Sequence, residues 1–132
     1  MKRLALALIA LIALMTVLVA GCSSGGGAVK TVDAQTFLDT ASQPGVTVVD
    51  VRTPAEYAAG HLDGAVNIDV ESSDFAQQLG SLDKATTYAL YCRSGNRSAA
   101  AADQMAAAGF TSIDNLTGGI ADLAAAGGQI VT

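Results

Sequence analysis

The chain has 132 residues and a formal net charge of −5, with 7 lysines and arginines against 12 aspartates and glutamates. This length fits one small domain. A nucleic-acid-binding surface needs many clustered basic side chains, so this composition excludes DNA or RNA as a partner.

Residues 1–21 have the pattern of a secretory signal. A charged start at Lys2 and Arg3 precedes the apolar run 4–19, which is shorter than the ~20 residues needed to span a bilayer comfortably. Two small residues then stand before Cys22, a pattern that resembles the bacterial lipobox, in which this cysteine is lipidated and becomes the mature N-terminus. We therefore expect a lipoprotein signal peptide, lipidation at Cys22 and a protein held at the extracytoplasmic face of a cell membrane. An uncleaved membrane anchor is the alternative.

Residues 22–28 read CSSGGGA and are expected to form a flexible tether, because serine and glycine have little surface to bury. The folded domain is then expected to cover residues 29–132. Loss of the signal would leave five cations against all 12 acids, a net charge near −7, and two of these five flank Cys92. With Cys22 lipidated, Cys92 has no cysteine to pair with, and its polar, cationic neighbours favour a reactive thiol over a buried small hydrophobe.

Strands and helices alternate along the chain. Short apolar or β-branched runs predict strands at 28–33, 46–51, within 59–68, at 86–92 and at 112–116. Helices are expected at 34–42, where Asp33 is the cap and Phe37 and Leu38 turn inward, and from Pro54, where Thr53 is the cap. Three further helices are expected: at 72–80, capped by Ser72 or Ser73; at 97–109, closed by Gly109; and within 118–128. This alternation predicts an α/β fold, with a small parallel five-stranded sheet flanked by helices.

Cys92 lies at the carboxyl end of a predicted strand and directly before a helix, which is where open α/β sheets bind ligands. In the loop CRSGNRS, Gly95 permits a sharp turn, and the backbone N–H groups of such a turn point into one concavity. The N-terminus of the following helix adds the positive end of its dipole. Cations and helix N-termini lower the pKa of a thiol. The loop therefore predicts an activated sulfur nucleophile inside a cradle for an anionic group.

Three motifs in order resemble those of the rhodanese-like sulfurtransferases. They are VVDVRTPAEYAAGHLDGAVNI at 48–68, the Cys-x4-Arg loop YCRSGNRS at 91–98 and GFTSIDNLTGGIADL at 109–123. The resemblance covers about residues 29–130. It implies that Cys92 takes the outer sulfur of a donor such as thiosulfate as a persulfide and passes it to a thiol, cyanide or protein acceptor. The loop residues Arg93, Ser94, Gly95, Asn96, Arg97 and Ser98 would bind the anion, and no cofactor or metal ion is implied.

The resemblance gives the remaining polar residues supporting roles. Asp50 and Arg52 are expected to act as a structural ion pair, and His61 as a hydrogen-bonded turn residue. Arg97 is expected to brace the loop, and Arg93 to touch the anionic substrate. Glu56 and Tyr57 are assigned only helix and core positions.

The sequence departs from the family pattern at three positions: Asp63 and Asp69 stand where the family usually has proline, and Leu123 where it usually has tryptophan. These changes bear on packing, because the loop around Cys92 is intact.

Two other functions remain open from the sequence. One is a persulfide carrier or binding module with little turnover of small donors. The other is a cysteine phosphatase, which the loop length disfavours, because such phosphatases place five residues between the cysteine and the arginine and this chain places four.

Overall fold

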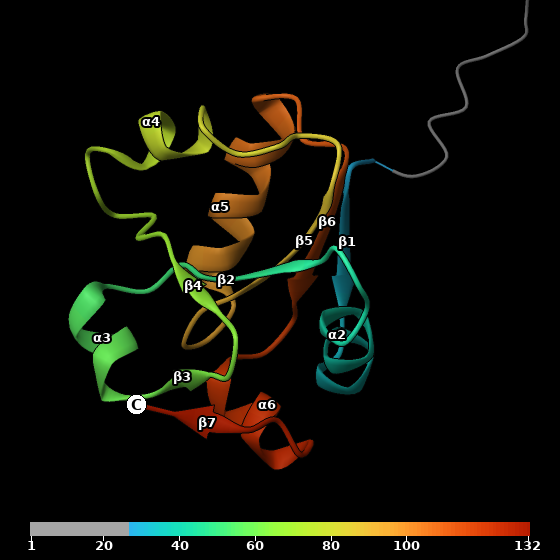
Figure 1. Ribbon diagram of the computed structural model, residues 1–132, viewed down its shortest axis with the longest axis vertical. Coiled ribbons are helices and arrows are strands. Elements are labelled where there is room, and N and C mark those ends of the chain that lie inside the picture. Colours follow the sequence, from blue (N-terminus) through green and yellow to red (C-terminus); the bar gives the residue numbers. More distant parts are fainter. Residues whose placement is uncertain (1–26) are drawn as a thin grey trace, which may run out of the picture.

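A five-stranded, fully parallel sheet forms the centre of the protein, as predicted (Figure 1). The computed structural model describes residues 27–132. The strands run in the order β1 (Val29–Val32), β6 (Ser112–Leu116), β5 (Thr87–Tyr91), β2 (Thr47–Asp50) and β4 (Val66–Asn67). The central strands β5 and β2 are almost wholly buried, as expected for parallel strands covered on both faces.

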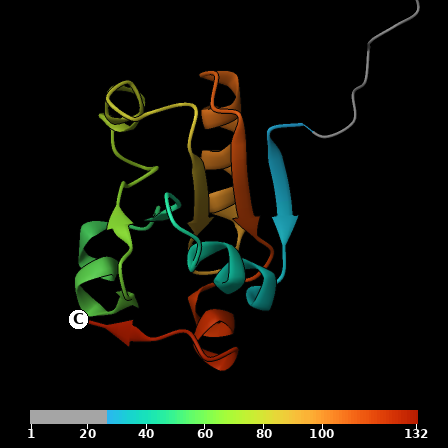
Figure 2. The same ribbon diagram turned by 45° about the vertical axis from the view of Figure 1, so that its right-hand side comes forward.

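Helices cover both faces of the sheet (Figure 2). One face packs against α4 (Phe75–Leu79) and α5 (Asn96–Ala107), and its core contains Phe75, Ala101 and Met105. The other packs against α2 (Ala34–Ala41) and α6 (Ile120–Ala125), and its core contains Phe37 and Leu123. Leu123 is fully buried, so the smaller side chain still fills a core position.

Two helix starts agree with their predicted caps. The Asp33 carboxylate accepts a hydrogen bond from the Thr36 N–H at 2.8 Å at the start of α2. The Thr53 hydroxyl accepts one from the Glu56 N–H at 3.3 Å, and Pro54 opens α3 (Pro54–Ala59). Both side chains satisfy a helix N–H that has no intrahelical partner.

The predicted start of α4 is wrong. The helix begins at Phe75 with Asp74 in the cap position, and no side chain caps it. Ser72 instead closes a local turn, because its hydroxyl accepts from the Asp74 N–H at 3.1 Å and its carbonyl from the Phe75 N–H at 3.1 Å. This turn delays the helix and directs the Phe75 ring into the core.

A second, two-stranded antiparallel sheet was not predicted. It pairs β3 (His61–Leu62) with β7 (Ile130–Val131). The Asp63 N–H extends this pairing with a 2.8 Å hydrogen bond to the Gln129 carbonyl. A proline at position 63 has no N–H to donate, so the departure from the family pattern adds a bond that ties β7 to the domain.

None of the helices within residues 27–132 is long and apolar enough to cross a membrane. The expected signal peptide, Cys22 and most of the expected tether lie outside the described residues.

Candidate active site

The parallel strands β2, β5 and β6 end at the same edge of the sheet, and the arrows of β5 and β6 point down to it in Figure 2. Cys92 follows β5 there and is fully buried, and α5 begins four residues later. Gly95 makes the turn with φ of +100°, and a Cβ on it would lie 2.7 Å from the Thr117 carbonyl oxygen. Both the backbone conformation and the lack of space require glycine at this position.

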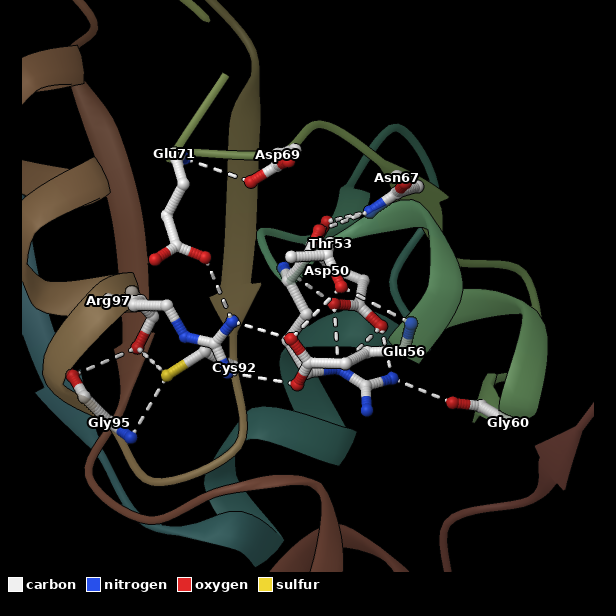
Figure 3. A network of polar contacts seen from close by, with 12 residues as sticks. Asp50, Thr53, Glu56, Gly60, Asn67, Asp69, Glu71, Cys92, Gly95 and Arg97 are labelled. Atoms are coloured by element: carbon white, nitrogen blue, oxygen red, sulfur yellow. Dashed lines mark hydrogen bonds and ion pairs between the residues drawn. The ribbon is translucent and has the colours of Figure 1, made fainter.

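The thiol of Cys92 sits inside the turn that its own loop makes (Figure 3). Its Sγ accepts a hydrogen bond from the Gly95 N–H at 3.0 Å and lies 3.5 Å from the Ser98 Oγ. Burial alone would raise the pKa of Cys92. The hydroxyl of Ser98 and the N–H groups of Ser98, Ser94 and Gly95 outweigh burial, so the pKa of this thiol is lowered. The loop thus has the geometry of an anion nest that stabilises a thiolate.

The segment between β6 and α6 supports this loop from behind. The Ile120 N–H donates to the Cys92 carbonyl at 3.0 Å. Gly119 lies against the loop so closely that a Cβ on it would overlap the Arg93 carbonyl. This segment belongs to the motif at 109–123, whose residues had no expected role in the site.

Arg97 is held by carboxylates from two other elements. Its Nη1 and Nη2 donate to the two Glu56 oxygens at 2.7 and 3.0 Å, and Nη1 also lies 3.4 Å from Glu71 Oε2 (Figure 3). The two hydrogen bonds from Arg97 lower the pKa of Glu56 from its ordinary 4.5 to about 2. This geometry is the one expected if Arg97 braces the loop, whereas Glu56 was expected only to occupy a helix or core position.

Asp69 shapes the segment that carries Glu71. Its carboxylate accepts from the Glu71 N–H at 2.9 Å and closes a short turn at a position where the family usually has proline. The sequence offers no signal for the contact between Glu71 and Arg97, because 26 residues separate them.

The other loop residues differ in exposure. Arg93, Ser94 and Asn96 are exposed, whereas Ser98 is fully buried against the thiol. The Arg93 guanidinium makes no hydrogen bond or ion pair with any other described side chain, so no neighbouring carboxylate among residues 27–132 neutralises its charge.

Asp50 and Arg52 form a buried ion pair at the end of β2. The Arg52 Nε lies 2.9 Å from Asp50 Oδ1, and its Nη2 lies 2.6 Å from Asp50 Oδ2 and 2.6 Å from the Gly60 carbonyl. The hydrogen bonds to Asp50 raise the pKa of Arg52. The pair links the end of β2 to the end of α3, which is the supporting position expected for it.

His61 is engaged in its own turn. Its Nδ1 lies 2.9 Å from the Tyr57 carbonyl, and its ring stacks on the Tyr57 ring at 3.7 Å between centroids. Within residues 27–132 no group of three or more His, Cys, Asp or Glu side chains is placed to hold a metal ion.

A buried cysteine sulfur that faces several N–H groups, at the carboxyl edge of a parallel sheet, has the geometry of a nucleophilic cysteine site. Residues 33–126 match the rhodanese-like domain family, and the chain belongs to this family.

The chain is also similar to proteins named as thiosulfate sulfurtransferases and to solved structures. Thiosulfate sulfurtransferase GlpE of Pseudomonas entomophila is 40% identical over 76 residues, which are 57% of this chain and 67% of GlpE. Thiosulfate sulfurtransferase PspE of Escherichia coli is 33% identical over 76 residues, 58% of this chain and 72% of PspE. The crystal structure of Alr3790 from Anabaena superposes with a TM-score of 0.68 at 28% identity, over 76% of this chain and 81% of that one. The crystal structure of a rhodanese-related protein from Thermoplasma volcanium superposes with a TM-score of 0.67 at 29% identity. The match covers 77% of this chain and 97% of that one.

Proposed function

We propose that the protein is a sulfurtransferase that carries sulfane sulfur on Cys92. The Cys92 thiolate attacks the outer sulfur of a donor such as thiosulfate, the donor's S–S bond breaks, and sulfite leaves with the bonding electron pair. An acceptor thiolate or cyanide then attacks the outer sulfur of the persulfide and releases the Cys92 thiolate. No external oxidant or reductant is needed, because each step exchanges one bond to sulfur for another.

The observation that carries this proposal is the set of donors around Cys92 Sγ. The Gly95 N–H at 3.0 Å and the neighbouring Ser94 and Ser98 N–H groups favour the thiolate over the thiol. The same concavity suits a persulfide anion, whose charge sits on the outer sulfur. Arg93 is the loop cation that we assign to the anionic donor, since Arg97 is already paired with Glu56.

Intact mass after incubation with thiosulfate tests the proposal. We expect one added sulfur atom on the native protein, its release by cold cyanide, and no addition to Cys92→Ser. Repeated turnover with thiosulfate and cyanide indicates an enzyme, whereas one transfer per protein indicates a carrier. An unmodified native protein contradicts both.

A parallel assay addresses the phosphatase alternative. The Cys-x4-Arg loop is tight, and cleavage of an aryl phosphate also needs a general acid for the leaving group. We expect no enzymic release of phosphate from an aryl phosphate by the native protein. Phosphate release without persulfide formation would make the protein a phosphatase.

We further propose that the protein is exported and held at the membrane through a lipid on Cys22. The support is the sequence pattern of residues 1–22. Cys22→Ala should abolish lipid labelling and move the protein out of the detergent-partitioning membrane fraction. Labelling that persists in this variant refutes the anchor.

A further inference from the structure

A hollow of about 310 Å³ lies beside the Cys92 loop. It is lined on the α3 side by Arg52, Glu56, Ala59 and Gly60, and on the opposite side by Ile120, Ala121, Ala124 and Ile130. Its volume is at the lower end of the range for small-molecule sites. The residues of the loop itself do not line it, so the hollow is a separate space from the anion nest.

Both walls of the hollow are bonded directly to the loop. On one side the Ile120 N–H donates to the Cys92 carbonyl at 3.0 Å. On the other side Glu56 holds Arg97 through two hydrogen bonds. A molecule in this hollow is therefore a neighbour of the sulfur-carrying loop.

Arg52 brings an unused donor to the hollow. Its side chain is only 7% exposed, and its Nε and Nη2 are occupied by Asp50 and the Gly60 carbonyl. The third nitrogen, Nη1, makes no hydrogen bond to any residue between 27 and 132. Nη1 keeps its contact with solvent in the hollow, so a ligand oxygen can replace water as its acceptor.

The charges of the lining select the ligand. Arg52 and Glu56 carry the only charges that line the hollow, and they have opposite signs. Asp50 balances Arg52 from behind, Arg97 balances Glu56, and Glu71 contacts Arg97. A ligand that carries only a negative charge would be repelled by Glu56, and a ligand that carries only a positive charge would be repelled by Arg52. A zwitterion presents a carboxylate to Arg52 and an ammonium to Glu56, and the remaining wall is apolar.

We propose that this hollow binds the α-amino-acid head of a small thiol acceptor, with L-cysteine as the smallest member of the class. The inference rests on the proposed persulfide at Cys92 and names the acceptor that collects its sulfur. The acceptor thiolate attacks the outer persulfide sulfur, the S–S bond to Cys92 breaks, and Cys92 leaves as a thiolate. The product is the acceptor persulfide, and no electrons are gained or lost overall.

The two enantiomers of cysteine give the sharpest test. Their thiols have the same pKa and the same intrinsic reactivity, so only a chiral site distinguishes them. With the persulfide form of the full protein, we expect the second-order rate constant of sulfur transfer to be at least fivefold larger for L-cysteine than for D-cysteine. Cysteamine lacks the carboxylate and should react as slowly as D-cysteine at equal thiolate concentration. Equal rates for the two enantiomers overturn the proposal.

A pair of neighbouring substitutions in α6 tests the location. Ala124 and Ala125 are both exposed, but only Ala124 lines the hollow. Ala124→Leu should lower the ratio of the L-cysteine rate to the cyanide rate at least fivefold, because leucine fills the hollow and cyanide needs no docking site. Ala125→Leu should leave that ratio unchanged. An equal effect of the two substitutions places the acceptor elsewhere.

Binding without chemistry separates this inference from the proposed function. S-methyl-L-cysteine has the same head group and cannot accept sulfur. Calorimetry on the protein without persulfide should show that it binds more tightly than its D-enantiomer, and Ala124→Leu should abolish the difference. If Cys92 forms no persulfide, the proposed function fails. The binding measurement would still show whether the hollow binds an amino acid. If neither enantiomer binds, the hollow does not hold an amino acid.

Discussion

Two adjacent buried residues show how hydrogen bonds decide the ionisation of the site. Tyr91 and Cys92 are both fully buried. Burial raises the pKa of Tyr91 well above its ordinary value, and the single Leu62 N–H at 2.9 Å does not compensate. Cys92 receives several donors from its own loop, and its pKa is lowered. The reactive thiol therefore depends on the shape of the loop more than on the solvent exposure of the sulfur.

Ser98→Ala should make the thiol less reactive at neutral pH. The substitution removes the hydroxyl beside Sγ, so the pKa of Cys92 should rise and the thiolate should form at higher pH. Loss of one hydrogen bond of about 1 kcal/mol corresponds to an alkylation rate about fivefold lower at pH 7. Iodoacetamide labelling across a pH series measures this. Ser94→Ala is the control, because Ser94 contributes its N–H, which alanine keeps. An unshifted Ser98→Ala profile would show that the backbone alone tunes the thiol.

The Glu56–Arg97 ion pair should give the protein an acid-sensitive share of its stability. The pKa of Glu56 is lowered from 4.5 to about 2 in the folded state, so the stabilisation is complete above pH 4.5 and is lost as the pH falls towards 2. Because both side chains are partly exposed, we expect about 1 kcal/mol or less at pH 7. Thermal unfolding of Glu56→Gln should therefore start a few degrees lower than wild type at pH 7 and converge with it near pH 2.

Glu71→Gln is the comparison for this measurement. Glu71 lies farther from Arg97, at 3.4 Å, and its side chain is 58% exposed. Its substitution should therefore lower the free energy of unfolding less than Glu56→Gln does. A gap between wild type and Glu56→Gln that persists unchanged at pH 2 would mean that the ion pair is not its cause.

At the scale of elements, local signals were sufficient for most of the fold. The β-branched runs, the caps Asp33 and Thr53, and Gly109, whose φ of +99° ends α5, all lie within a few residues of the features that they determine. The pairing of β3 with β7 was missed because each strand has two residues and neither forms without the other.

The candidate site divides in the same way. The nest around Cys92 is local in sequence and was predictable from one loop. The carboxylates that hold Arg97 lie 41 and 26 residues away from it, and the hollow is assembled from α3, α6 and β7. No sequence spacing indicates such contacts, because tertiary packing alone brings these residues together.

The contact between the Cys92 loop and the β6–α6 segment predicts a severe effect for Gly119→Ala. The added Cβ would overlap the Arg93 carbonyl, and backbone on both sides leaves no flexible side chain to move. The loop must shift and its N–H groups leave Sγ, so persulfide formation should fall at least tenfold with a lower melting temperature. Gly27→Ala is the control, because nothing lies within 4 Å of its Cβ. A fully active Gly119→Ala protein would show that the loop does not need this support.

For the whole molecule, the parallel sheet separates the described N-terminal end from the site. β1 runs parallel to its neighbour β6, so the chain enters at the edge opposite Cys92 (Figures 1 and 2). The C-terminal strand β7 instead lies beside β3, and Ile130 in β7 lines the hollow. An attachment before β1 should therefore leave the site accessible, whereas an attachment after β7 crowds the acceptor hollow.

Immobilisation through the two ends of residues 27–132 tests this polarity. Coupling to a bead through an added residue before Gly27 should leave both persulfide formation and transfer to L-cysteine within about twofold of the free protein. Coupling after Thr132 should slow transfer to L-cysteine severalfold while persulfide formation from thiosulfate is affected less, because Ile130 of β7 lines the hollow and β7 pairs with β3 rather than with the Cys92 loop. Mass spectrometry of the eluted protein measures the first step, and persulfide released into solution measures the second. Equal losses for the two attachments would show that β7 does not control access to the acceptor, and a larger loss on N-terminal coupling would mean that the site opens towards the edge where β1 begins.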